Sequence, residues 1–139
     1  MASRDTFPDT SFLASSLSSG NKASKGRLYG DGAWSPSDNN NDDDYLQIDL
    51  LYEFVICAVA TQGNPTADHW TTKYKLQLSY CGSNWVIYKE NNVDKVGLIN
   101  PIRYYEIKNK SCLFVSLFFG ISSFSLEITF LYSCCKFGE

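Results

Sequence analysis

The 139-residue sequence contains a single histidine and five cysteines, and no two of the cysteines form a CxxC pair. A structural zinc site needs four cysteine or histidine ligands at short, regular spacings. The sequence therefore gives no support for such a site. Because five is an odd number, at least one thiol must be free or paired with another chain.

Signatures of catalysis are missing as well. The sequence has no GxSxG turn for an activated serine and no glycine-rich phosphate loop. Any Ser–His–Asp arrangement would depend on the one histidine, His69. We therefore expect that this chain is not an enzyme.

Basic residues are also few. Twelve Lys and Arg residues against fifteen Asp and Glu residues leave a formal net charge of -3. Lys22, Lys25 and Arg27 form one small basic cluster, which we interpret as a solvated loop. Nucleic acid is therefore not an expected partner. The first residues, MASRDTFPDTSF, lack the apolar stretch of a secretory signal peptide.

What the chain does contain is a composition suited to one packed domain. Hydrophobic residues make up 44% of it and aromatic residues 15%. A chain of this length buries roughly two-thirds of its unfolded surface, which is enough for a real core. We expect Trp34 and Trp85 to contribute to this core or its rim.

Alternating apolar residues predict strands, and no helical periodicity is evident before residue 97. We expect strands at 45–50 and 54–61, followed by a hairpin over 73–90 whose turn is the polar CGSN sequence at 81–84. One face of the first hairpin strand carries apolar residues, namely Tyr74, Leu76, Leu78 and Tyr80. Short strands with long polar connections indicate an antiparallel sandwich or barrel.

Three connections are long for such a fold, at 14–27, 30–44 and 62–73. The second contains eight consecutive residues, SDNNNDDD at 37–44, that are all Ser, Asn or Asp. Long loops on a rigid scaffold often carry function.

The segment 111–135 has only one charged residue, Glu127. Three interpretations stay open: closing strands of the domain, a membrane-spanning segment, or a tail outside the domain. Its length and flanking lysines favour a span, whereas its serines and the central Glu127 argue against a lipid-facing helix.

Several motifs in order resemble the discoidin, or coagulation factor V/VIII type C, domain. They are PDTSFLASS, GAW, YLQIDL, VATQG, YKLQLSY and NWVIYKEN, all within residues 8–96. The resemblance implies an all-β, jelly-roll β-sandwich of the galactose-binding type, possessed by adhesion or matrix proteins outside the cell. It implies a non-catalytic module, part of a larger multidomain protein, that binds ligands through loops at one end.

Residues 97–139 depart from the family pattern and retain only faint echoes of it, PIRYYEI and LYSC. We therefore divide the chain into a discoidin domain at 8–96 and a divergent segment at 97–139, with a sandwich left incomplete at its C-terminal side. A disulfide between the two ends of the domain, frequent in the family, cannot form because no cysteine precedes Cys57.

The loops supply the candidate ligand contacts, because amide, carboxylate and imidazole groups hydrogen-bond sugar hydroxyls. The candidates are Asn21, Asn40, Asp42, Asn64, Asp68 and His69. Asp38 and Asp42 also offer oxygen ligands for a structural Ca²⁺ ion, although their loop lacks the glycine and closing glutamate of an EF-hand. An anionic phospholipid is the alternative ligand, favoured only by Leu17, Lys22 and Lys25.

Overall fold

The computed structural model describes residues 7–38, 41, 43–65, 73–90, 93–94, 96–98, 102–119 and 127–131. The described residues form strands and two short 3₁₀ helices, with no α-helix among them. In chain order the elements are η1 (Asp9–Ser11), β1 (Phe12–Ala14), η2 (Ala23–Gly26), β2 (Tyr45–Gln62), β3 (Lys73–Ser79), β4 (Trp85–Ile87), β5 (Lys89–Glu90), β6 (Val93–Asp94), β7 (Val96–Leu98), β8 (Ile102–Phe119) and β9 (Glu127–Leu131).

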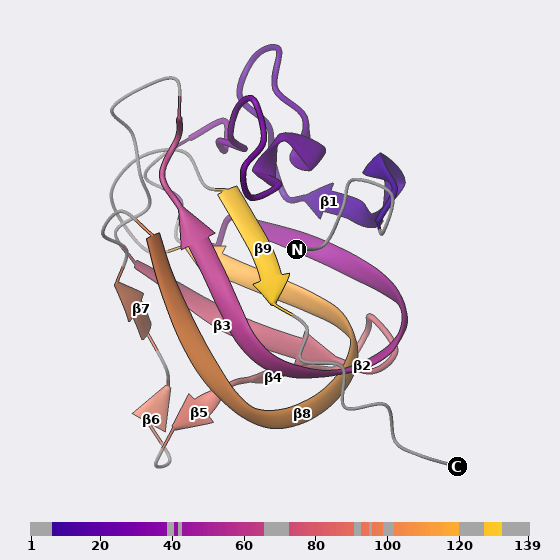
Figure 1. The fold of residues 1–139 in the computed structure, drawn as a ribbon. Coiled ribbons are helices and arrows are strands. Elements are labelled where there is room, and N and C mark those ends of the chain that lie inside the picture. Colours follow the sequence, from indigo (N-terminus) through magenta and orange to yellow (C-terminus); the bar gives the residue numbers. More distant parts are fainter. Residues whose placement is uncertain are drawn as a thin grey trace.

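Two long antiparallel strands, β2 and β8, bend together and fold the sheet over on itself (Figure 1). Their pairing is interrupted between Asp49 and Phe54, where the register shifts. Leu51 adopts a left-handed backbone here, with φ of 65°, and its N–H donates to Asp49 Oδ1 at 2.8 Å. The two halves of each strand thereby line opposite layers, and the predicted all-β sandwich is confirmed.

The bend corrects one expectation. Residues 45–50 and 54–61 were predicted as two strands, but they belong to the single strand β2. The reason is that β8 follows β2 around the corner, so that hydrogen-bonded pairing resumes at Phe54 opposite Cys112. A curved partner keeps the backbone groups of both strands satisfied on either side of the bend.

The strand order in the main sheet is β1-β2-β8-β3-β4, with β9 added beside β2 and β7 beside β3. Strand β8 therefore joins β2 to β3 and includes the first part of the segment 111–135. None of the helical segments in the described ranges has the length and apolarity of a membrane span. The domain boundary placed after Val96 stays a prediction.

The core lies between the two layers, and the hairpin over β3 and β4 supplies part of it. Its turn passes through Gly82, whose φ of 73° suits a residue without a side chain. Alternation places Tyr80 on the same face as Tyr74, Leu76 and Leu78, but Tyr80 is 59% exposed, because β3 ends at Ser79 and the chain has already entered the turn. Ser79 is buried instead, and its Oγ accepts the N–H groups of Cys81 and Gly82.

The remaining core residues come from β1, β2, β3 and the loops before them. The members that are most buried are Trp34, Leu46, Ile48, Leu50, Ile56 and Val59. The expectation that Trp34 belongs to the core is confirmed.

Candidate functional site

The loops between β1 and β2 and the C-terminal end of β2 lie at the same, upper end of the sandwich in Figure 1. A contact supports this arrangement, since β9 pairs with the end of β2 and also touches η2. The chain leaves the sheet after Ala14 and re-enters it at Tyr45. These two positions are neighbours, because β1 pairs with the start of β2. A long excursion with neighbouring ends presents its polar residues on a fixed base.

Two serines, Ser15 and Ser16, fasten both ends of the polar run 37–44. The Ser15 N–H donates to the Tyr45 carbonyl at 3.1 Å, and the Ser15 Oγ accepts the Tyr45 N–H at 2.9 Å. At the other end the Ser37 N–H donates to the Ser16 Oγ at 3.1 Å. The run is thus a loop tethered to the sandwich and not a linker.

The same serines hold the last residue of the run, Asp44, inside the protein. Asp44 is 1% exposed, and its Oδ1 accepts hydrogen bonds from the Ser15 Oγ at 2.5 Å and the Ser16 Oγ at 2.8 Å. The Trp34 Nε1–H donates to the Ser16 carbonyl at 3.0 Å, which connects this polar cluster to the core. These two donors offset part of the cost of burying a carboxylate, although the other oxygen, Asp44 Oδ2, has no hydrogen-bond partner among the described residues. Asp44 is therefore a buried anchor at the end of the loop.

The predicted calcium ligands are only partly within the described structure. Asp38 is exposed on the loop, whereas Asp42 lies outside the described residues. Among the residues that are described, no three His, Cys, Asp or Glu side chains come close enough to hold a metal ion. The calcium site stays a prediction.

Of the six predicted ligand contacts, two are described, Asn21 and Asn64. Asn21 is half-buried and closes a turn, since its backbone N–H and its Nδ2 donate to the Ser18 carbonyl and Oγ at 3.0 and 3.1 Å. Asn64 is half-buried just beyond the end of β2. The other four, Asn40, Asp42, Asp68 and His69, lie outside the described residues.

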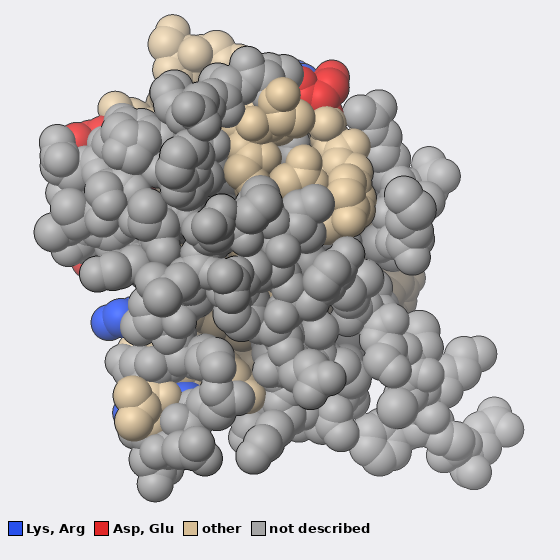
Figure 2. All heavy atoms as spheres, turned by 60° about the vertical axis from the view of Figure 1, so that its left-hand side comes forward, with Lys and Arg blue, Asp and Glu red and all other residues tan. Residues whose placement is uncertain are grey.

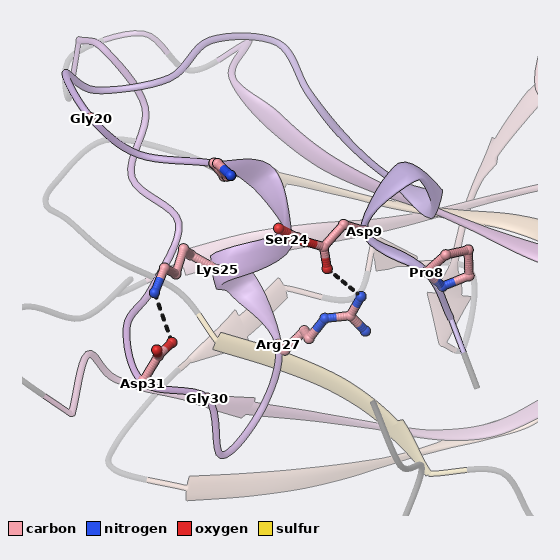
Figure 3. Close-up of a pocket in the computed structure, with 9 residues that line it drawn as sticks. Pro8, Asp9, Gly20, Ser24, Lys25, Arg27, Gly30 and Asp31 are labelled. Carbon is pink, nitrogen blue, oxygen red and sulfur yellow. Dashed lines mark hydrogen bonds and ion pairs between the residues drawn. The ribbon is translucent and has the colours of Figure 1, made fainter. Parts of the chain in front are cut away.

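A charged hollow of about 360 Å³ opens beside η2, next to Asn21 (Figure 3). Its lining is Pro8, Asp9, Gly20, Lys22, Ser24, Lys25, Arg27, Gly30 and Asp31. Figure 3 shows two ion pairs on either side of η2, and their distances are 2.8 Å for Lys25 Nζ to Asp31 Oδ1 and 2.9 Å for Arg27 Nη2 to Asp9 Oδ1.

The two ion pairs differ in how firmly they are held. The Arg27 side chain is 17% exposed, and its guanidinium lies 4.3 Å from the centre of the Phe12 ring. Its hydrogen bond to Asp9, assisted by one from Ser24, holds the pKa of the Asp9 carboxyl below its ordinary value of 3.8. Arg27 is thus a structural residue, and the interpretation of the whole basic cluster as solvated is wrong for it.

The second pair is open to solvent. The side chains of Lys25 and Asp31 are 42% and 69% exposed. Exposed ion pairs contribute at most about 1 kcal/mol, so this contact can exchange its partner at little cost. The charged residues spaced along 22–31 are the one sign of the hollow in the sequence, where nothing indicates that Asp9 contacts Arg27 to close it.

A further chemical group lies at the other end of β3, in the turn of the hairpin. Cys81 is a free, exposed thiol whose Sγ is 3.1 Å from the Ser83 Oγ. Hydrogen bonds from the Ser83 side chain and backbone, and then from the Asn84 backbone, lower the pKa of this thiol to about 7. The odd number of cysteines was the signal for a free thiol, although it did not indicate which one.

On the face turned forward in Figure 2, the described Lys and Arg side chains appear as small, separate groups, and described Asp and Glu side chains appear at other places on the same face.

A model of the F5/8 type C domain matches residues 11–110. The chain belongs to the F5/8 type C domain family. The resemblance seen in the motifs is thereby confirmed. Neuropilin-2 of Rattus norvegicus is 35% identical over 75 residues, which amount to 50% of this chain and 8% of Neuropilin-2. This F5/8 type C chain therefore spans less than a tenth of that relative.

Solved structures share the sandwich. Discoidin II from Dictyostelium discoideum superimposes with a TM-score of 0.64 at 20% identity, covering 84% of this chain and 52% of discoidin II. The CpGH89CBM32-5 module of Clostridium perfringens, solved in complex with GalNAc-β-1,3-galactose, gives a TM-score of 0.68 at 14% identity, covering 88% of this chain and 93% of the module. At these identities the likeness establishes the fold.

Proposed function

We propose that this F5/8 type C domain is a non-catalytic module that binds glycans outside the cell, through the loops at the upper end of the sandwich. The observation that carries the proposal is the tethering of the loop 37–44 by Ser15, Ser16 and Asp44. A loop held at both ends loses little conformational freedom when a ligand binds, which favours recognition of a small polar ligand. The fold shared with a module solved with GalNAc-β-1,3-galactose supports the same conclusion.

The ligand contacts would come from amide, carboxylate and imidazole groups on these loops, as the sequence predicts. In this proposal Asn64 is the described residue best placed, because it follows β2 at the loop-bearing end. Asn40, Asp42, Asp68 and His69 would complete the set. Asn21 would act mainly by shaping the turn that contains it.

Titration with GalNAc-β-1,3-galactose, followed by calorimetry, tests the proposal. Replacing Asn64 by alanine should weaken binding about tenfold, the effect of losing roughly one hydrogen bond to a ligand. Asn84→Ala is the matched control, because the hairpin turn 79–85 lies at the opposite end of β3 and should leave affinity unchanged. Absence of binding by the unaltered chain, or equal losses in both variants, would refute the proposal.

A bound Ca²⁺ ion at Asp38 and Asp42 is a separate part of the proposal. Calcium would stabilise this loop through carboxylate oxygens, its preferred ligands in proteins. Addition of EDTA should then lower the thermal midpoint of unfolding, and Asp42→Asn should abolish that shift. A midpoint that does not respond to EDTA or to added Ca²⁺ would exclude the ion.

An anionic phospholipid is the second candidate ligand, because one apolar side chain on the same loops is exposed. Leu17 is 45% exposed, and Lys22 follows on the same connection. Sedimentation with phosphatidylserine vesicles, compared with phosphatidylcholine vesicles, tests this alternative. Loss of sedimentation in Leu17→Ser would support it. Membership of a larger receptor remains a prediction, but residues 111–119 belong to β8 and pair with β2 and β3, which disagrees with a membrane segment there.

A further inference from the structure

We propose that the hollow beside η2 is a second site, which binds an anionic substituent, a sulfate or a carboxylate, carried by a glycan. This inference rests on the proposed glycan-binding function and gives it a substrate class. Apart from Pro8 and two glycines, the residues that line the hollow are polar or charged, and its cations outnumber its acids by one, with Lys22, Lys25 and Arg27 against Asp9 and Asp31. Such a lining selects a charged, well-hydrated group over an apolar one.

The size of the hollow limits the ligand to a small group. Its volume of about 360 Å³ lies at the lower end of the range of about 300–1,000 Å³ found for small-molecule sites. The position next to Asn21 also matters, since Gly20 and Lys22 on either side of it both line the hollow. An anionic substituent could therefore enter the hollow while its sugar reaches the adjoining loop.

The two ion pairs assign different roles to the cations. Arg27 is committed to Asp9 and to the Phe12 ring, so it positions the wall of the hollow. The Lys25 ammonium group is held by Asp31 at 2.8 Å, and both side chains are exposed to solvent. Asp31 thus occupies the position that an incoming anion would take.

Binding would proceed as an exchange of partners on Lys25. The sulfate or carboxylate oxygens replace the Asp31 carboxylate, which turns toward water, and Lys22 approaches as the second cation. The Lys25 stem passes close to Gly32, where the lack of a side chain leaves room for it. Charge-assisted bonds from ammonium to sulfate or carboxylate oxygens then replace the lost ion pair.

If the Asp31 carboxylate competes with the ligand anion for Lys25, two substitutions should have opposite effects on binding. Lys25→Gln should weaken binding of the anionic glycan, whereas Asp31→Asn should strengthen it by about two- to fivefold, the equivalent of one exposed ion pair. A residue that only supports the fold would not improve binding when it is removed. Glu53→Gln is the control for net charge, because Glu53 is an exposed acid on β2, outside both the hollow and the loop 37–44.

The experiment uses the full chain and two probes that differ in one group, GalNAc-β-1,3-galactose and its 6-O-sulfate, at low salt. We expect the sulfated probe to bind more tightly, to gain affinity only in Asp31→Asn, and to lose the advantage as salt is raised. The neutral probe should bind all variants equally. Urea unfolding midpoints within error of the unaltered chain confirm that each variant is folded.

Each contrary result has a separate meaning. If the neutral probe binds but Asp31→Asn leaves the sulfated probe unchanged or weaker, the hollow is not an anion site and the proposed function stands. If neither probe binds the unaltered chain, the proposed function itself fails. If Asp31→Asn strengthens sedimentation with phosphatidylserine vesicles but not binding of the sulfated glycan, the anion belongs to a lipid and the glycan assignment is overturned.

Discussion

Replacement of Asp44 by alanine removes the carboxylate that receives the hydroxyls of Ser15 and Ser16. Hydrogen bonds to a charged group contribute about 1.5–3 kcal/mol each, so two of them amount to about 3–6 kcal/mol. Part of this loss is offset, because the variant no longer desolvates a charge that is 1% exposed. The two serine oxygens also keep the N–H groups of Tyr45 and Ser37. We therefore expect a net loss of about 2–4 kcal/mol.

Urea unfolding followed by tryptophan fluorescence measures this loss. With a slope of about 1–3 kcal/mol per molar urea, a loss of 3 kcal/mol lowers the midpoint by about 1–3 M. The control is Asp43→Ala, an exposed acid one residue earlier, for which we expect a change within about 0.5 kcal/mol. Equal effects of the two substitutions, or a loss below about 0.5 kcal/mol for Asp44→Ala, would show that the tether is not what holds the loop.

Three further substitutions test local features. Iodoacetamide alkylation of Cys81 is measured as the rate difference from the Cys81→Ser variant. This rate should rise with a midpoint near pH 7, and the midpoint should move to higher pH in Ser83→Ala. A midpoint near pH 9 in the unaltered chain would contradict the hydrogen-bonded thiolate. Because the pKa of Asp9 is lowered in the folded protein, this residue contributes stability above pH 3.8, its ordinary pKa, and the contribution is lost as pH falls through the folded value. Arg27→Ala should raise the pKa of the Asp9 carboxyl, followed by NMR. An unchanged pKa would exclude Arg27 as the cause. Leu51→Gly should raise the free energy of unfolding by about 1 kcal/mol, because glycine adopts a positive φ without strain; a loss would show that the side chain matters more than the bend.

Local alternation was enough to find the hairpin over β3 and β4, since its strands are short and its turn has its own glycine. It was not enough to find that β2 continues past Asp49. Leu51 turns the chain without glycine or proline, so the sequence there carries no turn signal, and the bend is imposed by pairing with β8. Tyr80 was assigned to the wrong face for a related reason, because alternation does not show where a strand ends.

The candidate site depends even more on contacts between distant residues. The three acids at 42–44 look alike in sequence. The burial of Asp44 depends on its hydrogen bonds with Ser15 and Ser16, which lie far away in the sequence. The hollow likewise needs Asp9 from η1 against Arg27 beyond η2. Composition and motifs identify the family and the loops, whereas the division of their charged residues between structure and ligand requires the fold.

The loop-bearing end thus contains two kinds of charged residue, those that hold the loops and those that can meet a ligand. The charges that fix the loops, Asp44 and Arg27, are shielded from solvent and hydrogen-bonded within the protein, and so they are unsuited to a ligand. Lys25 and Asp31 form an ion pair whose side chains stay 42% and 69% exposed, so that an anion can replace Asp31 on Lys25 at little cost. Rigid anchors reduce the entropy lost on binding, while a weak exposed pair keeps a cation in place at little cost until a ligand anion replaces its partner. On this reasoning, affinity for an anionic glycan should depend on the exposed pair, and stability on the shielded charges.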